Sequence, residues 1–197
     1  MASGLQGLPS GYPGLDRHLA GGGWPQHALT EILLEHYGAG ELKLLMPALA
    51  RLSQPDRDRD PESTGWLAWI APPFQPYPPA LVQWGIDLCR VLIVRPREES
   101  EILWAAEQAL SSGNCAAVLL WPGVLSVAAS RRLQLAAEKG GSWAIAFRPL
   151  SARSQSSAAA LRILLSASRE GTELRILKNR GSRPATLRNV LRDYADA

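Results

Sequence analysis

The segment from Ala28 to Leu52 combines an apolar strand pattern, a turn with glycines and an amphipathic helix pattern. A strand that passes through such a turn into a helix is the outline of a nucleotide-binding P-loop. A functional P-loop needs amides that wrap the phosphates, a Lys that reaches them and a hydroxyl that holds Mg²⁺. If Gly40 is the last loop glycine, Glu41 stands at the lysine position and Leu42 at the hydroxyl position. The segment therefore predicts a nucleotide-site architecture without its chemistry, or else an ordinary strand-turn-helix unit.

The turn residues also argue against a bound cofactor. Glu35 replaces the first glycine of the motif, and Gly38 and Gly40 remain. A carboxylate repels a triphosphate, and an apolar side chain offers Mg²⁺ no ligand. The three histidines have no metal-like spacing. We therefore predict no cofactor, no metal and no catalytic residue, and a degenerate P-loop formed by Glu35, Gly38, Gly40, Glu41 and Leu42.

Length and composition suit one α/β domain with a sizeable core. The chain has 197 residues, of which 46% are hydrophobic and 20% charged. Its longest apolar runs are too short to span a bilayer, and its N-terminus lacks the basic start and apolar core of a signal peptide. We expect a cytoplasmic protein with no membrane contact.

Strand and helix patterns alternate along the chain. Apolar runs predict strands at 28–34, 65–71, 90–94, 115–121 and 143–147. Helical periodicity predicts helices at 40–52, 98–112 and 125–139, with one or two helical turns at 79–85. This alternation predicts a mostly parallel sheet flanked by helices.

The predicted organisation is a single domain in several segments. A Gly/Pro-rich entry segment, 1–27, precedes an α/β core at 28–150, which contains a flexible charged loop at 53–64. A β-hairpin extension follows at 151–192, where runs at 160–168 and 173–179 flank a turn, and 186–191 adds a further strand. Residues 193–197 form a tail.

Positive charge is concentrated in the C-terminal extension. The net charge of the chain is +3, but residues 148–192 contain nine arginines and Lys178 against two glutamates. Such a field attracts nucleic acid or an acidic protein face, and the alternative is a solvated strand surface. The candidate DNA-binding or partner-binding residues are Arg153, Arg175, Lys178, Arg180, Arg183 and Arg188.

Tryptophan is abundant, with seven residues in the chain. Five of them lie inside apolar strand or helix runs and are expected in the core. Trp84 and Trp121 border loops instead. We consider these two residues candidate interface anchors.

Two long phrases, VQWGIDLCRVLIVRPREESEILWAAEQALSSGNCAAVLLWP and ELRILKNRGSRP, resemble the core of the RecA recombinase. The phrases GYPGLDRHLAGGGWPQHALTEILLEHYGAGELKLLMPALARL and WLAWIAPP more closely resemble the bacterial ImuA family, which is related to the SulA cell-division inhibitors. The resemblance implies a RecA-like core and a role in DNA-damage-inducible mutagenesis. The implied partners are an ImuB-like polymerase homologue, a DnaE-type polymerase and RecA, in error-prone translesion synthesis.

The RecA resemblance does not extend to catalytic residues. Trp121 stands at or beside the position of the Mg²⁺-orienting Asp, and Arg148 or Pro149 replaces the γ-phosphate-sensing Gln. The segment after the second predicted strand, where RecA has its catalytic Glu, is APPFQP and contains no carboxylate. Because these requirements fail together, we expect no enzyme activity.

Lys178, Asn179 and Arg180 do resemble the residues by which a RecA subunit reaches its neighbour's ATP. The resemblance therefore implies a non-catalytic adaptor of an error-prone translesion synthesis complex. Two alternatives to this adaptor role remain open. One is a SulA-type division inhibitor that binds FtsZ. The other is an ATP-dependent recombination factor with a cryptic nucleotide site.

Overall fold

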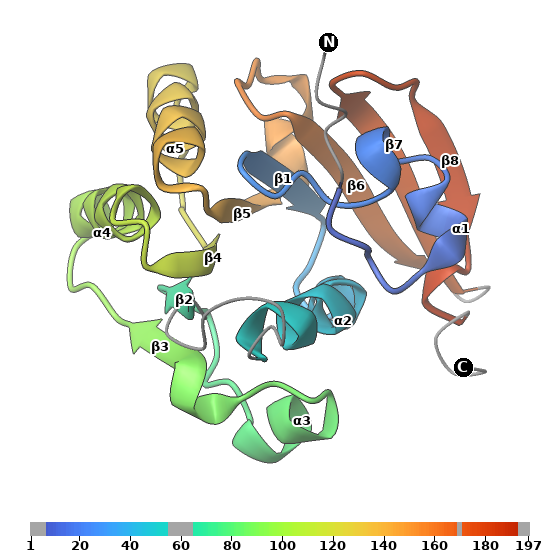
Figure 1. Ribbon diagram of the computed structural model, residues 1–197. Helices are drawn as coiled ribbons and strands as arrows, with labels where there is room; N and C mark the ends of the chain where they lie inside the picture. Colours follow the sequence, from blue (N-terminus) through green and yellow to red (C-terminus); the bar gives the residue numbers. More distant parts are fainter. Residues whose placement is uncertain (1–6, 55–64, 169–170, 193–197) are drawn as a thin grey trace, which may run out of the picture.

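A computed structural model describes residues 7–54, 65–168 and 171–192 as a mixed α/β fold around one eight-stranded sheet (Figure 1). The strands are β1 (Leu29–Leu34), β2 (Trp66–Ile70), β3 (Val91–Val94), β4 (Cys115–Leu120), β5 (Trp143–Pro149), β6 (Leu161–Ser168), β7 (Gly171–Asn179) and β8 (Ala185–Arg188). The helices are α1 (Pro13–Asp16), α2 (Glu41–Ser53), α3 (Pro78–Gln83), α4 (Glu99–Ser111) and α5 (Val127–Gly140). Short 3-10 turns occur at η1 (Ala20–Gly22), η3 (Leu88–Arg90), η4 (Leu150–Ser154) and η5 (Val190–Arg192). The predicted α/β class is confirmed.

The strand order is β3-β2-β4-β5-β1-β6-β7-β8. The first six strands in this order pair in parallel, whereas β7 and β8 continue the sheet in antiparallel pairing. The strand expected at 186–191 stops early, since Asn189 has a φ of 57°, which no strand can accommodate. After Asn189 the chain forms the 3-10 turn η5 instead of a strand.

Two apolar layers enclose the sheet. In β1, Ile32 and Leu34 pack towards α2, whereas Leu29 packs towards α4 and α5, because alternate side chains of a strand point to opposite faces. Figure 1 shows α4 and α5 together on one side of the sheet and α2 and α3 on the other. The sheet centre is therefore covered on both faces, as a parallel sheet requires.

Two of the five tryptophans expected in the core are exposed. Trp66 is 40% exposed and Trp104 is 64% exposed. Ala106 and Leu110 are the buried residues of α4, and Trp104 lies two residues before Ala106. Two residues turn an α-helix by about 200°, so Trp104 points away from the buried face. Trp66 begins β2 at the exposed end of an otherwise buried strand.

The predicted flexible loop lies largely outside the described residues, at 55–64. The same holds for residues 1–6 of the entry segment and for the tail at 193–197. No helix in the described part of the chain has the length and apolar character to cross a membrane.

Helix α2 continues through Pro47, which cannot donate a hydrogen bond to the carbonyl of Lys43. The hydroxyl of Tyr12 donates to that carbonyl oxygen instead, at 2.9 Å. Tyr12 is fully buried in the N-terminal segment. This contact joins the entry segment to the helix and compensates for the missing amide.

Replacing Tyr12 by phenylalanine should therefore lower the free energy of unfolding by about 1–2 kcal/mol, because the Lys43 carbonyl loses its donor. Urea unfolding measures this difference. Tyr77→Phe removes an exposed hydroxyl and serves as a control, with an expected change within about 0.5 kcal/mol. Equal stability of the two variants would contradict the role assigned to Tyr12.

Candidate partner-binding groove and basic surface

An apolar groove of about 450 Å³ lies at the carboxyl ends of β2 and β4. Its walls come from the β1–α2 turn, the proline-rich segment after β2, and α3. Ligands of open α/β sheets bind at the carboxyl ends of the strands. The position and the volume of the groove make it the candidate functional site of the described fold.

Both predicted interface anchors line this groove, although they are distant in sequence. Trp121 follows β4 and stacks on Phe147, with ring centroids 4.5 Å apart and an interplanar angle of 16°. Its ring also lies 5.8 Å from that of Trp69 in β2. Trp84 follows α3 and is partly buried. The aromatic floor is thus fixed by packing on the core, and the anchor role stays a prediction.

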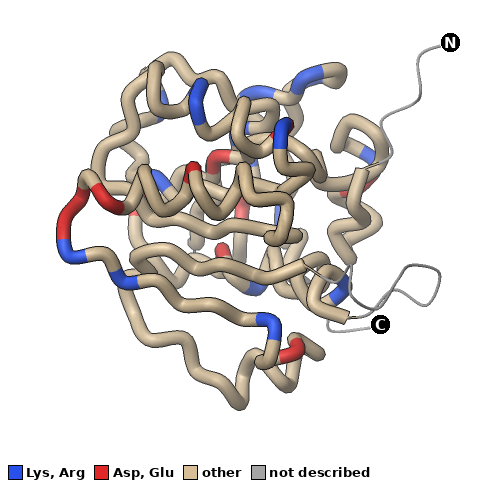
Figure 2. Tube along the Cα trace, turned by 60° about the vertical axis from the view of Figure 1, so that its left-hand side comes forward, with Lys and Arg blue, Asp and Glu red and all other residues tan. Residues whose placement is uncertain are grey.

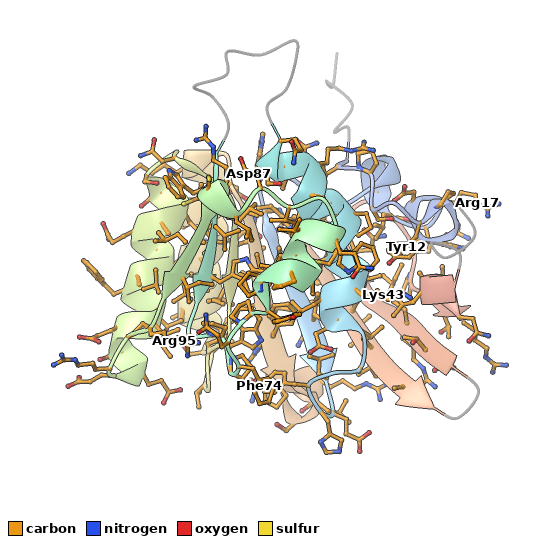
Figure 3. The ribbon with its side chains drawn as sticks, turned by 90° about the horizontal axis from the view of Figure 1, so that it is seen from below. Tyr12, Arg17, Lys43, Phe74, Asp87 and Arg95 are labelled. Carbon is orange, nitrogen blue, oxygen red and sulfur yellow. The ribbon has the colours of Figure 1, made fainter. Side chains whose placement is uncertain are left out.

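The rim of the groove carries exposed aromatic rings that the sequence reading did not select. Phe74 is 71% exposed and Tyr77 is 69% exposed. Figure 3 shows Phe74 at the edge of the molecule, close to the turn that leads into α2. Grouped exposed apolar side chains mark interaction sites on soluble proteins. Their sequence signal was PPFQPYPP, where residues 72–77 lie outside regular structure and the last two prolines begin α3.

In the β1–α2 turn, a carboxylate binds the backbone. The Glu41 side chain is 6% exposed, and its two oxygens accept from the Gly38 amide at 2.8 and 3.1 Å. Burial, and then the charge of Glu41, raise the pKa of the Tyr37 hydroxyl above its usual value. An amide of this turn is therefore engaged by the protein's own anion.

At position 40, any residue other than glycine would strain the backbone and collide with a neighbouring side chain. Its φ is 97°, in the left-handed region where glycine is favoured. A Cβ atom built at this position would lie 2.4 Å from Cδ1 of Leu191 in η5. The close contact packs the C-terminal part of the described chain against the start of α2.

We predict that MgATP binds this protein no tighter than about 100 µM, equivalent to about −5.5 kcal/mol. The reason is that Glu41 and Leu42 supply neither a cation for the phosphates nor a hydroxyl for Mg²⁺. Isothermal titration calorimetry measures the affinity. Tighter binding would contradict this prediction and support the ATP-dependent alternative.

The structure also contains a buried ionic cluster that the sequence reading missed. Glu31 in β1 is fully buried and accepts from Arg162 Nε at 2.8 Å and from Arg148 Nη1 at 3.3 Å. Ser157 Oγ donates to the same carboxylate at 2.5 Å. The only sequence signal was a carboxylate inside the apolar run LTEILL.

The two arginines of this cluster hold the segment that follows β5. Arg162 donates from Nη2 to the Ala152 carbonyl at 2.9 Å and from Nη1 to the Gln155 carbonyl at 3.0 Å. Arg148 donates from Nη2 to the carbonyl of Leu125 at 2.9 Å and to the side chain of Gln155 at 2.7 Å. The cluster therefore fixes η4 and the residues after it on the sheet.

The six predicted basic residues do not form one free patch. Arg175 and Arg188 both approach Glu173, at 2.5 and 3.6 Å. The Arg175 hydrogen bond is the main cause of a lowered pKa for that carboxyl group. Lys178 Nζ donates to the Ser157 carbonyl at 2.9 Å. Figure 2 shows Lys and Arg spread over several parts of the fold.

The other three basic residues are exposed, as Arg175 and Arg188 also are, but they differ from those two in their partners. Arg153 lies in η4, whereas Arg180 and Arg183 lie at the turn between β7 and β8. No described residue forms an ion pair with any of these three side chains. Arg180 also lines a second cavity of about 500 Å³, which His27 and Glu138 share. These three arginines remain candidates for binding an anionic partner.

Within the described ranges, no group of three or more His, Cys, Asp or Glu side chains could hold a metal ion.

Comparison with known proteins identifies relatives that are named SulA or ImuA. Residues 28–144 match the family model of the cell division inhibitor SulA. SulA of Edwardsiella piscicida is 35% identical over 115 residues, which cover 57% of this chain and 64% of that protein. Protein ImuA of Caulobacter vibrioides is 32% identical over 139 residues, which cover 70% of this chain and 55% of that protein. The resemblance to ImuA and SulA proteins is thus confirmed.

A solved structure is also similar. The crystal structure of SulA from Pseudomonas aeruginosa is 28% identical, with a TM-score of 0.48, and the match covers 61% of this chain and 97% of that one. The chain spans less than two thirds of the length of the two curated relatives described above.

Proposed function

Since the chain belongs to the family of the cell division inhibitor SulA, we propose that it acts within this family as a non-catalytic adaptor of an error-prone translesion DNA synthesis complex. The apolar groove is the observation that carries the proposal. It lies where an α/β protein usually binds a ligand, but it offers aromatic rings rather than groups for phosphate or metal.

The proposal includes a RecA-like core with a degenerate P-loop. The β1–α2 unit supports it, because the turn has the P-loop position in an α/β sheet while Glu41 binds the Gly38 amide. On this account the nucleotide site has been replaced by a protein-binding site. The anchors would be Trp84 and Trp121, with Phe74 and Tyr77 on the rim.

Two of the comparisons favour the adaptor. The match to ImuA covers 70% of this chain, against 57% for SulA of Edwardsiella piscicida. The SulA family model ends at residue 144, before the basic β6–β8 extension. We propose an ImuB-like polymerase homologue as the groove's partner, in a cytoplasmic complex with a DnaE-type polymerase and RecA.

The second candidate is a division inhibitor that binds FtsZ. The family description and the SulA relatives favour it. In this case the same groove would receive FtsZ, because it is an exposed apolar site of the described residues.

A deletion strain separates the two candidates. In the adaptor account, the deletion lowers the frequency of damage-induced mutation and leaves damage-induced filamentation unchanged. Wild-type protein restores mutagenesis, whereas the double variant Phe74→Ala/Tyr77→Ala does not. Loss of filamentation with normal mutagenesis would replace the adaptor by the division inhibitor.

A further inference from the structure

The buried cluster around Glu31 contains more positive than negative charge. Two guanidinium groups, those of Arg148 and Arg162, share one carboxylate. Lys178 joins them through Ser157, whose carbonyl accepts from the ammonium group and whose hydroxyl donates to Glu31. Glu31 is the one carboxylate that the described residues bring into these hydrogen bonds. Backbone carbonyls satisfy several of the donors but cancel no net charge.

The excess charge reaches the surface where the segment after η4 contacts the end of β7. Lys178 links this strand end to the segment after η4, and the Arg180 amide donates to the Ala160 carbonyl at 2.9 Å. Figure 1 shows the orange segment near residue 155 beside the red turn between β7 and β8. Burial, and then the charges of Arg180 and Arg162, lower the pKa of the Lys178 ammonium group, while the charge of Glu31 acts in the opposite direction.

The exposed side chains at this place are polar. Arg153, Gln155 and Ser156 are exposed on one segment, and Arg180, Ser182 and Arg183 are exposed on the other. A protein interface needs an apolar centre, which these side chains do not supply. They also include no aromatic ring on which a base could stack. Phosphate oxygens are the groups that such a surface can bind best.

We propose that the strip formed by Lys178, Arg180 and Arg183 binds the phosphodiester backbone of nucleic acid without reading its sequence. Lys178 connects the strip to the buried cluster through the Ser157 carbonyl, and Glu138 lines the same cavity as Arg180. The proposal does not depend on the adaptor function, because the strip and the aromatic groove share no residue.

Fluorescence anisotropy with a labelled oligothymidylate and a labelled random-sequence duplex tests the strip, between about 50 and about 200 mM salt. Arg180→Glu/Arg183→Glu should weaken binding of both probes at least about tenfold. The slope of log affinity against log salt should fall by about 1.4 to 1.8, since each lost phosphate contact changes it by about 0.7 to 0.9. Arg180→Gln/Arg183→Gln should reduce the slope while adding no repulsion.

The matched control is Arg51→Glu/Arg131→Glu, which makes the same charge change at exposed positions on α2 and α5. It should keep most of the affinity. Equal losses in the control and strip variants would overturn the proposal, because binding would then follow net charge alone. Failure of the wild type to bind either probe at the lowest salt would also overturn it. Binding of labelled polyglutamate in place of both nucleic acids would assign the strip to an acidic protein.

Discussion

Replacing Glu31 by alanine should lower the free energy of unfolding by about 3–5 kcal/mol, because Arg148 and Arg162 would remain buried without their carboxylate. Chemical denaturation measures the loss. Glu31→Gln keeps the shape and removes the charge, so it should be destabilising in the same direction even if the alanine variant fails to fold.

Two controls separate this charge effect from a loss of packing. Glu35→Ala removes an exposed carboxylate from the adjacent turn and should change stability by less than about 0.5 kcal/mol. The triple variant Glu31→Leu/Arg148→Met/Arg162→Met removes all three charges and should regain most of the stability lost in Glu31→Ala. A loss below about 1 kcal/mol in Glu31→Ala would contradict the role of the cluster in holding η4.

The double variant Phe74→Ala/Tyr77→Ala should weaken partner binding by at least about 30-fold, equivalent to about 2 kcal/mol. Both rings stand exposed on the groove rim, so their removal takes contact area from the interface but little from the core. Thermal unfolding should therefore be nearly unchanged. Biolayer interferometry with the immobilised partner measures the change in affinity.

Trp104→Ala is the matched control for the groove. Trp104 is 64% exposed on α4, and it does not line the groove. Its removal takes away an exposed aromatic ring of larger size and should leave partner affinity within about threefold. If Trp104→Ala weakens binding as much as the double variant does, the groove is not the binding site.

Elements of the sheet and its helices could be predicted because their signals are local. The strand at 29–34 and the helix at 99–111 follow from apolar spacing within a few residues. The end of β8 could not be predicted, since the left-handed backbone of Asn189 also depends on the hydrogen bond that its amide donates to the Thr172 carbonyl. The exposure of Trp104 could have been predicted from its position around the helix, whereas its apolar character alone suggests a place in the core.

The candidate sites were predictable only in part. Trp84 and Trp121 could be selected because they border loops, but their meeting in one groove depends on strand order. The partners of Glu31 lie 117 and 131 residues away in sequence, so no local pattern predicts the cluster. The concentration of basic residues in the C-terminal part of the chain could be read directly from the sequence. Only the fold separates Arg175 and Arg188, which approach Glu173, from Arg180 and Arg183, which form no ion pair with a described residue.

The affinity of the purified protein for an ImuB-like polymerase homologue, measured beside its affinity for FtsZ from the same organism, tests the adaptor role most directly. We expect that the ImuB-like homologue binds, that Phe74→Ala/Tyr77→Ala abolishes most of this binding, and that FtsZ does not bind. Binding of FtsZ alone, with the same sensitivity to the groove variant, would contradict the adaptor role and assign the groove to division inhibition.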